Sequence, residues 1–309
     1  MEAEFTRIQQ MLAEQDYIAD ESIVTALYLA TTLKRPLLIE GPAGVGKTEI
    51  AKSMARALET DLIRLQCYEG LDSTTALYEW NYQHQLLHIK LAEHSTKSIE
   101  EKEAEIFSER FLLKRPLLQA ITHHRTPVLL IDELDRADEE FESFLLEVLS
   151  DWQITIPEIG TIQASHIPYV VLTSNRTREL SDAVRRRCLY LWIDYPEFEK
   201  EVAIVRQKVP EANERLAQQV TRFMELVREM ELAKVPGVAE TLDWARALVA
   251  LHRDELDQTV VEQTLGVIFK DHQDIQRVRS SLTELLEKVG VSTILTPEKV
   301  KEIQQKAGG

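Results

Sequence analysis

The chain has 309 residues, of which 44% are hydrophobic and 28% charged, a composition typical of a globular protein large enough for two domains. Its net charge of −16 disfavours non-specific binding to nucleic acid over the whole surface, although it leaves a local basic channel open. The acidic residues 1–5 and the short apolar runs lead us to expect neither a secretory leader nor a membrane-spanning helix, and therefore a cytoplasmic protein.

The two cysteines, Cys67 and Cys188, form no CxxC pair. Their spacing supports neither a zinc knuckle nor a disulfide framework, so we expect both to be free and buried.

The first two-thirds of the chain alternates between apolar runs and stretches with helical periodicity. The apolar runs predict core strands at 36–40, 62–66, 126–132, 168–175 and 189–193. The periodic stretches predict helices at 3–14, at 20–33, at about 51–58, at 96–123 and around 141–149. This alternation predicts an α/β fold with a mostly parallel sheet covered on both faces.

Two stretches depart from that alternation. Residues 67–95 carry four aromatic residues and are interpreted as an inserted loop or hairpin, and residues 153–157 with 160–163 predict a second hairpin. After about residue 195 we find no further core strand. The remaining chain predicts helices at 197–208, 211–232, 239–253, 258–269, 272–288 and 297–306. We therefore predict an α/β domain at 1–195 and a helical domain at 196–309.

The segment Gly41-Pro42-Ala43-Gly44-Val45-Gly46-Lys47-Thr48 fits G-x-x-x-x-G-K-[ST] between a predicted strand and a predicted helix. Glycines let the backbone curl so that its N–H groups and the helix N-terminus form an anion cradle. In such a loop Lys47 reaches the β- and γ-phosphates, and the Thr48 hydroxyl is a ligand of Mg²⁺. The segment therefore predicts binding of ATP with Mg²⁺.

Hydrolysis requires two further groups, and Val128-Leu-Leu-Ile-Asp132-Glu133 supplies two acids at the end of one apolar strand. We predict Asp132 as the carboxylate that holds Mg²⁺, directly or through water. We predict Glu133 as the general base for the attacking water. Two solvated carboxylates at a strand end are the alternative.

A polar residue ends the fourth predicted strand, and basic residues lie just before the fifth. Asn175 ends the fourth strand and is predicted to orient the water, if that strand neighbours both motif strands; a turn-forming asparagine is the alternative. Arg185, Arg186 and Arg187 precede the fifth strand. They are predicted to face the ATP of a neighbouring subunit, with a solvated basic patch or a nucleic-acid contact as alternatives.

Other polar clusters are interpreted as structural. His84 and His88 are spaced for one helical face but have no evident third metal ligand. His123-His124 is interpreted as a helix end. The acidic run Asp135, Asp138, Glu139, Glu140 and Glu142 is interpreted as the solvated face and start of the helix after the third strand.

Taken together, the motifs resemble those of the AAA+ ATPase superfamily. Four stretches resemble its MoxR family, in particular the CoxD-like branch, over nearly the whole chain. They are Gly41–Glu49, Leu130–Ala137, Leu172–Leu180 and Arg186–Tyr190, and Tyr68–Asp72 also points to the branch.

The resemblance implies a P-loop α/β domain with a small helical lid, and active sites between the subunits of a ring, usually a hexamer. Asn175 would be the first sensor, and Arg187, with Arg186 as second choice, the trans-acting arginine finger. Residues 67–95 would be the insertion of the second helix, and 152–166 the hairpin before the sensor, both lining a pore or facing a client. The stretch 237–243 matches the second sensor but has no arginine, which puts coupling of the lid in doubt.

The resemblance further implies a chaperone-like ATPase that matures a metalloenzyme or protein complex, beside a partner with a von Willebrand factor A domain. The client would be a molybdenum enzyme in the CoxD-like branch. A nucleic-acid motor or loader and a nucleotide-gated scaffold with little turnover are the alternatives. The paired acids and the arginine cluster argue against a small-molecule kinase.

Overall fold

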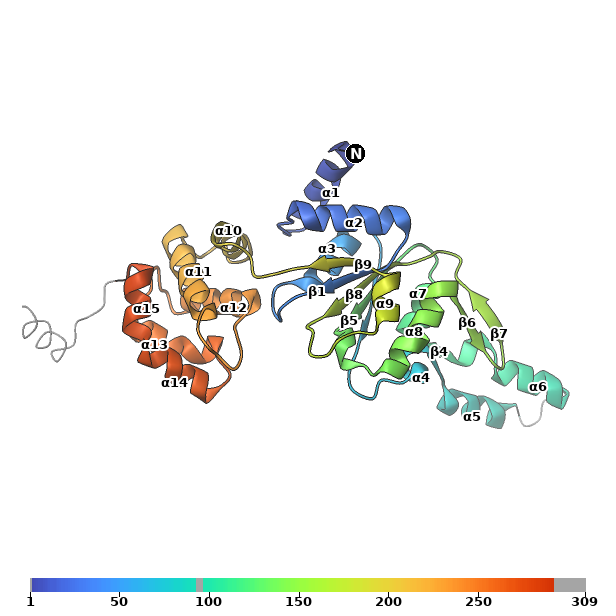
Figure 1. The fold of residues 1–309 in the computed structure, drawn as a ribbon. Helices are drawn as coiled ribbons and strands as arrows, with labels where there is room; N and C mark the ends of the chain where they lie inside the picture. The colour runs from blue at the N-terminus through green and yellow to red at the C-terminus, as the bar shows by residue number, and fades with distance from the viewer. Residues whose placement is uncertain (1, 93–96, 292–309) are drawn as a thin grey trace, which may run out of the picture. The chain divides into compact units, whose positions relative to one another are not determined.

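The structure, a computed structural model, describes residues 2–92 and 97–291 (Figure 1). The predicted helix at 297–306 lies outside the described residues. The chain divides into two compact units, Met1–Gly41 with Lys47–Ile193, and Pro42–Gly46 with Asp194–Gly309. The predicted domain limits, 1–195 and 196–309, stay a prediction.

The first unit contains a parallel sheet in which all five predicted strands are confirmed. They are β1 (Leu37–Glu40), β2 (Leu62–Gln66), β5 (Val128–Asp132), β8 (Tyr169–Ser174) and β9 (Leu189–Trp192), in the order β2-β5-β8-β1-β9. Strand β8 therefore lies between β5 and β1 and pairs with both. These two strands lead into the paired acids and the glycine loop, respectively. Because parallel strands end at the same edge, the residues after β1, β5 and β8 meet there.

Alternation of side chains along the strands separates two apolar cores, as the period of two requires. Leu37 and Ile39 pack with α1 (Glu2–Ala13), α2 (Glu21–Leu33) and α3 (Lys47–Ala57). On the other face Leu38 packs with α7 (Pro116–Ile121), α8 (Glu139–Asp151) and α9 (Asp182–Arg187). Each fully buried Leu or Ile contributes roughly 1.5–3 kcal/mol, so both faces hold the sheet in place.

The region between β2 and β5 corrects the prediction of one helix over 96–123. It contains α4 (Ser73–Leu77), β3 (Tyr78–Trp80), α5 (Tyr82–Leu91), α6 (Ile99–Ile106), a short 3₁₀ turn at Glu109–Phe111 and β4 (Leu112–Lys114) before α7. Strand β4 pairs antiparallel with β3. The helix breaks because Phe111 and Leu112 bury their side chains in the core and Pro116 starts a new helix. The insertion is thus a β3–β4 hairpin accompanied by the helices α4, α5 and α6, and it extends beyond 67–95.

The second predicted hairpin is confirmed, with β6 (Gln153–Ile156) antiparallel to β7 (Gly160–Gln163). A 3₁₀ turn at Leu134–Arg136 joins β5 to α8.

From Asp194 to Val291, the described part of the second unit contains helices that form a core of their own. They are α10 (Phe198–Lys208), α11 (Glu214–Arg228), α12 (Val238–Ala250), α13 (Gln258–Ile268), α14 (His272–Ser280) and α15 (Leu282–Val289). The predicted helix at 272–288 is therefore two helices, which meet at Ser281. Phe223 and Trp244 lie at the core, with ring centroids 5.0 Å apart.

The second unit contains a buried ion pair. Arg228 donates to both oxygens of Glu201, at 2.6 and 2.8 Å, and both side chains are buried. This two-bond geometry offsets the cost of taking two charges out of water.

Candidate active site

The glycine loop begins where β1 ends, and its first glycine is required by a close approach. A Cβ on Gly41 would lie 1.9 Å from the carbonyl oxygen of Ile193, which no side chain tolerates. Gly46, the last glycine before α3, has φ +96°, a left-handed conformation that favours glycine. The loop conformation is therefore built into the sequence at these positions.

Lys47 begins α3 and is only 6% exposed. Its Nζ donates to the carbonyl oxygen of Gly41 at 2.7 Å and to Oδ1 of Asn175 at 2.7 Å. Burial lowers the pKa of Lys47 to about 8, while the nearby acids Asp135, Asp132 and Glu133 partly offset that effect. The loop lysine and the residue after β8 are thus brought together, as the strand order requires.

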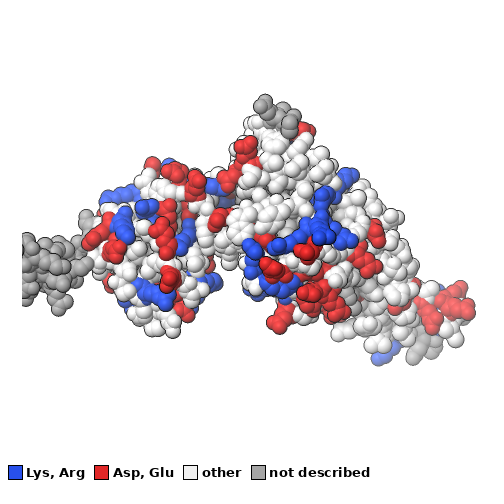
Figure 2. All heavy atoms as spheres, in the orientation of Figure 1, with Lys and Arg blue, Asp and Glu red and all other residues white. Residues whose placement is uncertain are grey.

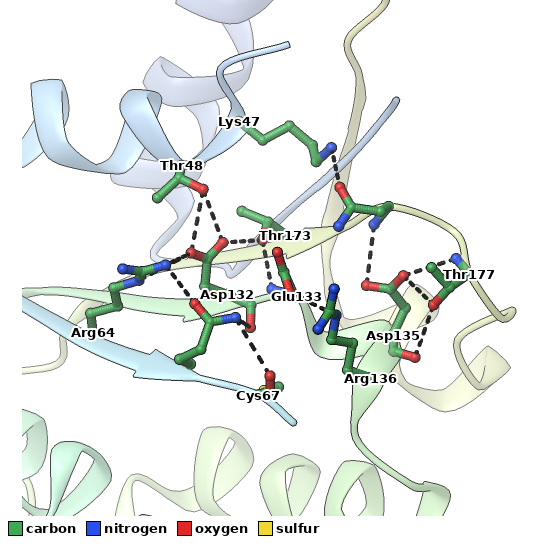
Figure 3. A network of polar contacts seen from close by, with 12 residues as sticks. Lys47, Thr48, Arg64, Cys67, Asp132, Glu133, Asp135, Arg136, Thr173 and Thr177 are labelled. Carbon is green, nitrogen blue, oxygen red and sulfur yellow. Dashed lines mark hydrogen bonds and ion pairs between the residues drawn. The ribbon is translucent and has the colours of Figure 1, made fainter. Parts of the chain in front are cut away.

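Asp132 ends β5 and is 2% exposed (Figure 3). Its Oδ1 accepts hydrogen bonds from the hydroxyls of Thr48 at 3.0 Å and Thr173 at 2.5 Å. Its Oδ2 accepts from Nε of Arg64 at 3.0 Å. Oxygen ligands suited to a hard cation, the Thr48 hydroxyl and the Asp132 carboxylate, therefore lie side by side.

Glu133 follows directly and has φ +56°, an uncommon left-handed conformation for a residue with a side chain. Its N–H donates to Oγ1 of Thr173 at 2.9 Å, which fixes the turn to β8. Its carboxylate is part-exposed and pairs with Nε of Arg136 at 2.7 Å. Glu133 is thus held at the strand end with its carboxylate accessible.

The interpretation of the acidic run as a solvated face is wrong for two of its five members. Asp135 is 3% exposed and accepts from the N–H groups of Asn175 at 3.1 Å and Thr177 at 2.9 Å. Glu142 is 1% exposed and pairs with Arg178. Both acids are buried because they tie the β5 and β8 connections together; Asp138 caps α8, and Glu139 and Glu140 are exposed.

The three consecutive arginines have different surroundings. Arg185 is part-buried, and its Nη2 lies 3.6 Å from Oε2 of Glu40, a 1%-exposed carboxylate at the end of β1. Arg186 and Arg187 are exposed, and Arg35 donates to the carbonyl oxygens of both residues, at 3.0 and 3.4 Å. Arg185 therefore belongs to an ion pair within the chain, whereas Arg186 and Arg187 are exposed and lie just before β9, at the other end of the strands.

The histidines are placed outside this site. His84 and His88 both pack against Phe111, and His88 lies 3.4 Å from Glu105. Among residues 2–92 and 97–291, one group has metal-type ligands within 4.8 Å of one another, namely Asp61, His123 and His124. Arg125 pairs with Asp61 at 3.2 Å, which opposes a second cation there.

Both cysteines are buried and free, as expected. Burial raises the pKa of each thiol to about 12, so neither is a reactive thiolate.

Comparison with known proteins agrees with this geometry. Residues 36–188 match the family described as AAA domain (dynein-related subfamily), which spans the glycine loop, the paired acids and the arginines. The chain carries an AAA+ ATPase domain. It is an ATP hydrolase, as the loop and paired acids predict.

Sequence similarity to known proteins covers most of the chain. A protein of Staphylococcus haemolyticus described as uncharacterised is 24% identical, over 90% of this chain and 99% of its own. The gas vesicle ATPase GvpN of Haloferax mediterranei is 24% identical, over 87% of this chain and 79% of its own. A solved structure of Thermotoga maritima RuvB has 18% identity and a TM-score of 0.48, and covers 88% of this chain and 81% of that one.

The AAA+ domain also contains site residues that sequence reasoning missed. The sequence patterns do not single out Arg64, Thr173 or Glu40, and they predict a solvated Asp135 where the structure buries it. A partial signal exists for Arg64, which interrupts the apolar run of the second predicted strand between Ile63 and Leu65. The other three lie in runs where burial and partners depend on the strand order.

Two remaining expectations concern the arginine of the second sensor and a membrane-spanning helix. In the second unit Arg246 pairs with Asp243 at 3.1 Å on the exposed side of α12, and the stretch 237–243 offers no arginine. Within the described part of the chain, the helices are too short or too polar to cross a membrane.

Proposed function

We propose that the chain is a Mg²⁺-dependent, ring-forming AAA+ ATPase of the MoxR type that remodels a protein client. The CoxD-like assignment, a hexameric ring, a cytoplasmic location and a metalloenzyme client are the finer parts of this proposal. The proposal rests on one observation: Arg187 is exposed and lies at the strand ends opposite the start of the chain's own phosphate loop.

The hydrolysis chemistry follows from the residues gathered at the strand ends. In our proposal the loop and Lys47 bind the phosphates, and Asn175 orients a water near the γ-phosphate. Glu133 accepts the proton of that water as its oxygen bonds to phosphorus and the bond to the ADP oxygen breaks. The products are ADP and inorganic phosphate. The left-handed backbone at Glu133 supports this role, because such strain persists where a site requires it.

The same residues fit a Mg²⁺ ion. Thr48 and Asp132 would hold it, because their oxygens are hard donors 3.0 Å apart and Asp132 is buried. When bound, the ion would neutralise charge on the phosphate oxygens. Asp132 acts in our proposal by holding its carboxylate ready between Thr48 and Thr173.

The position of Arg187 supports assembly. Leu189 pairs with Leu37 in the parallel register, and Gly41 follows four residues after Leu37. At about 3.3 Å per residue, the loop begins about 13 Å further along the strands than β9 does. Arg187 precedes β9 and therefore lies at the opposite end of the strands from its own loop. We propose that it stabilises charge at the γ-phosphate of a neighbouring subunit, with Arg186 as second choice.

A protein client is supported by the inserted helices. Leu86, Leu87 and Leu91 on α5 are 60%, 54% and 77% exposed, and Ile99 on α6 is 78% exposed. Exposed apolar side chains gathered in one insertion favour contact with another protein. On the face drawn in Figure 2, basic side chains are interspersed with acidic ones, an arrangement that favours a protein over a nucleic-acid backbone.

A mixing experiment tests the shared site. Arg187→Ala and Lys47→Ala should each hydrolyse little ATP alone. Mixed together they should regain activity, because about a quarter of the interfaces in a random ring then join an intact loop to an intact finger. Arg215→Ala, an exposed arginine on α11, is the matched control and should keep full activity.

Failure of the mixture to regain activity would count against a shared site. Recovery of ATP hydrolysis when Arg186→Ala replaces Arg187→Ala in the mixture would assign the trans-acting role to Arg186. Full activity of Arg187→Ala at a concentration where the protein stays monomeric would overturn the ring proposal.

The client is tested with Glu133→Gln, which should bind ATP without hydrolysing it and so trap a bound protein. Captured partners are identified by mass spectrometry, with Lys47→Ala as the control that lacks nucleotide. Stimulation of hydrolysis by DNA, with salt-sensitive DNA binding, would instead support the motor or loader. Unchanged cellular function of Glu133→Gln would support the scaffold.

A further inference from the structure

The Arg64 guanidinium contacts the carboxylate of Asp132, which is proposed to hold Mg²⁺ (Figure 3). Its Nε and Nη2 lie 3.0 and 2.5 Å from Oδ2 of Asp132. The same Nη2 lies 2.5 Å from Oε1 of Gln66. The contact is possible because Gln66 is the register partner of Asp132, and Arg64 lies two residues earlier on the same face of β2.

The Asp132 carboxylate has no spare acceptor position in this arrangement. A carboxylate offers about four lone-pair sites. Thr48 and Thr173 donate to Oδ1, and two N–H groups of Arg64 donate to Oδ2. A cation, or a water molecule that it binds, can therefore contact Oδ2 only if one of these hydrogen-bond donors leaves.

The donors differ in how readily they can leave. Thr173 is 1% exposed and also accepts the N–H of Glu133, so it is held on two sides. Thr48 lies at the start of α3 and is itself a proposed ligand of the ion. The Arg64 side chain is 48% exposed and lies on β2, the edge strand of the sheet. Arg64 is therefore the donor that can swing into solvent.

We infer that Arg64 is the resident counter-ion of Asp132, and that Mg²⁺ binds by exchanging with its guanidinium. The inference rests on the proposed magnesium role of Asp132. A buried carboxylate without a cation is costly, so Arg64 keeps the metal-free site charged and oriented. Two cations a few ångströms apart repel each other, so the guanidinium and the metal exclude each other. Arg64 thereby sets the Mg²⁺ concentration that the enzyme requires.

The exchange separates metal binding from nucleotide binding. Arg64 contacts Asp132 and Gln66 but not the glycine loop in the described contacts of its side chain. Nucleotide affinity without Mg²⁺ should therefore not depend on Arg64. The gain in affinity on adding Mg²⁺ should depend on it.

The experiment titrates Mg²⁺ against binding of a fluorescent ADP analogue to the full chain. Arg64→Met should lower the Mg²⁺ concentration for half-maximal effect by about three- to tenfold, since a part-exposed charged contact no longer competes. Arg64→Lys keeps the charge but not the two-bond contact, and should give a smaller decrease. Arg56→Met, which removes an exposed arginine paired with Glu49 on α3, is the matched control and should give no change.

A second readout is independent of nucleotide. Electron paramagnetic resonance of Mn²⁺, with the metal alone, should show tighter binding to Arg64→Met than to the wild-type chain. Thermal unfolding without metal should show a lower Tm for Arg64→Met, and added Mn²⁺ should raise it more than in the wild type.

An unchanged or raised Mg²⁺ requirement in both Arg64 variants would overturn the inference and make Arg64 a fixed anchor of Asp132. If Arg64→Met fails to fold, the Arg64→Lys titration decides alone. If the wild-type chain binds nucleotide with no Mg²⁺ dependence, the proposed magnesium site fails first. The two failures are therefore distinguishable.

Discussion

The two ends of the parallel sheet differ in how their charged groups are satisfied. At the ends of β1, β5 and β8, Lys47, Asp132 and Asp135 are buried and each contacts other side chains of the same chain. At the opposite end, Arg186 and Arg187 are exposed, and the described residues provide no carboxylate partner for either. One end is organised within the chain, whereas the other presents two cations to the outside.

The difference suggests how one chain serves two sites. Burial makes the phosphate end rigid and holds polar groups ready for charge that develops in the reaction. The exposed arginines keep their charge available for an anion that the chain itself does not provide. Arg35 fixes the backbone of both arginines while leaving their guanidinium groups exposed. Substitutions at the organised end should therefore have the largest effects, and those on the exposed surfaces the smallest.

The largest effect is expected from Lys47→Ala. Removing the buried ammonium deletes both its contacts and the charge facing the phosphates, so ATP affinity should fall on the order of 100-fold or more. Isothermal titration calorimetry measures it, with circular dichroism to show that the chain is folded. Retained affinity in a folded variant would contradict the assignment of the phosphate end.

Glu133→Gln should separate binding from hydrolysis. The amide keeps the size of the side chain but cannot accept a proton, so kcat should fall by about 10²–10⁴ while ATP affinity stays within a few-fold. Phosphate release under saturating ATP measures the rate. Arg136→Met, which removes the partner of Glu133, is the comparison and should lower kcat far less. An equal loss in both variants would assign the effect to the ion pair.

The pH dependence of nucleotide binding tests the burial of Lys47. Because its pKa is lowered to about 8, ATP affinity should fall by up to about tenfold per unit as pH rises above 8. Lys47→Arg should lose this dependence, since a guanidinium does not titrate there. A wild-type affinity constant from pH 7 to 9.5 would contradict the assignment.

The lowered pKa of Lys47 has the opposite consequence for the stability of the nucleotide-free chain, which should rise with pH where ATP affinity falls. Between about 8 and 10.5 the unfolded chain binds more protons at Lys47 than the folded chain does, so this residue's contribution to stability rises with pH. Denaturant unfolding across that window, compared with Lys47→Met, isolates the contribution.

The smallest effect on ATPase activity is expected on the exposed insertion. Leu86→Ser and Leu87→Ser should change basal hydrolysis and Tm little, because both side chains are more than half exposed. They should weaken binding of any client captured by the Glu133→Gln trap. A loss of basal hydrolysis would instead place α5 in contact with the catalytic end.

The inserted region shows where sequence reasoning failed. Periodicity predicts one helix over 96–123, but β4 interrupts it because it pairs with β3, in a register that joins Leu112 to Trp80, 32 residues earlier. Likewise Asp135 and Glu142 were interpreted as solvated, because acidic residues before an amphipathic helix usually are. Their partners come from the segment after β8. Long-range pairing of this kind leaves no local signal.

The sequence by itself determined the five core strands, the glycine loop and the paired acids, because alternation, glycine spacing and strand-end acids are local patterns that follow from backbone geometry. The tertiary structure alone decided that Arg64 contacts Asp132, that Asp135 supports Asn175, and that Arg185 pairs with Glu40 while Arg187 is exposed at the opposite end of the strands. The reason is the strand order β2-β5-β8-β1-β9, which sets the neighbours of each strand end and cannot be read from any one segment.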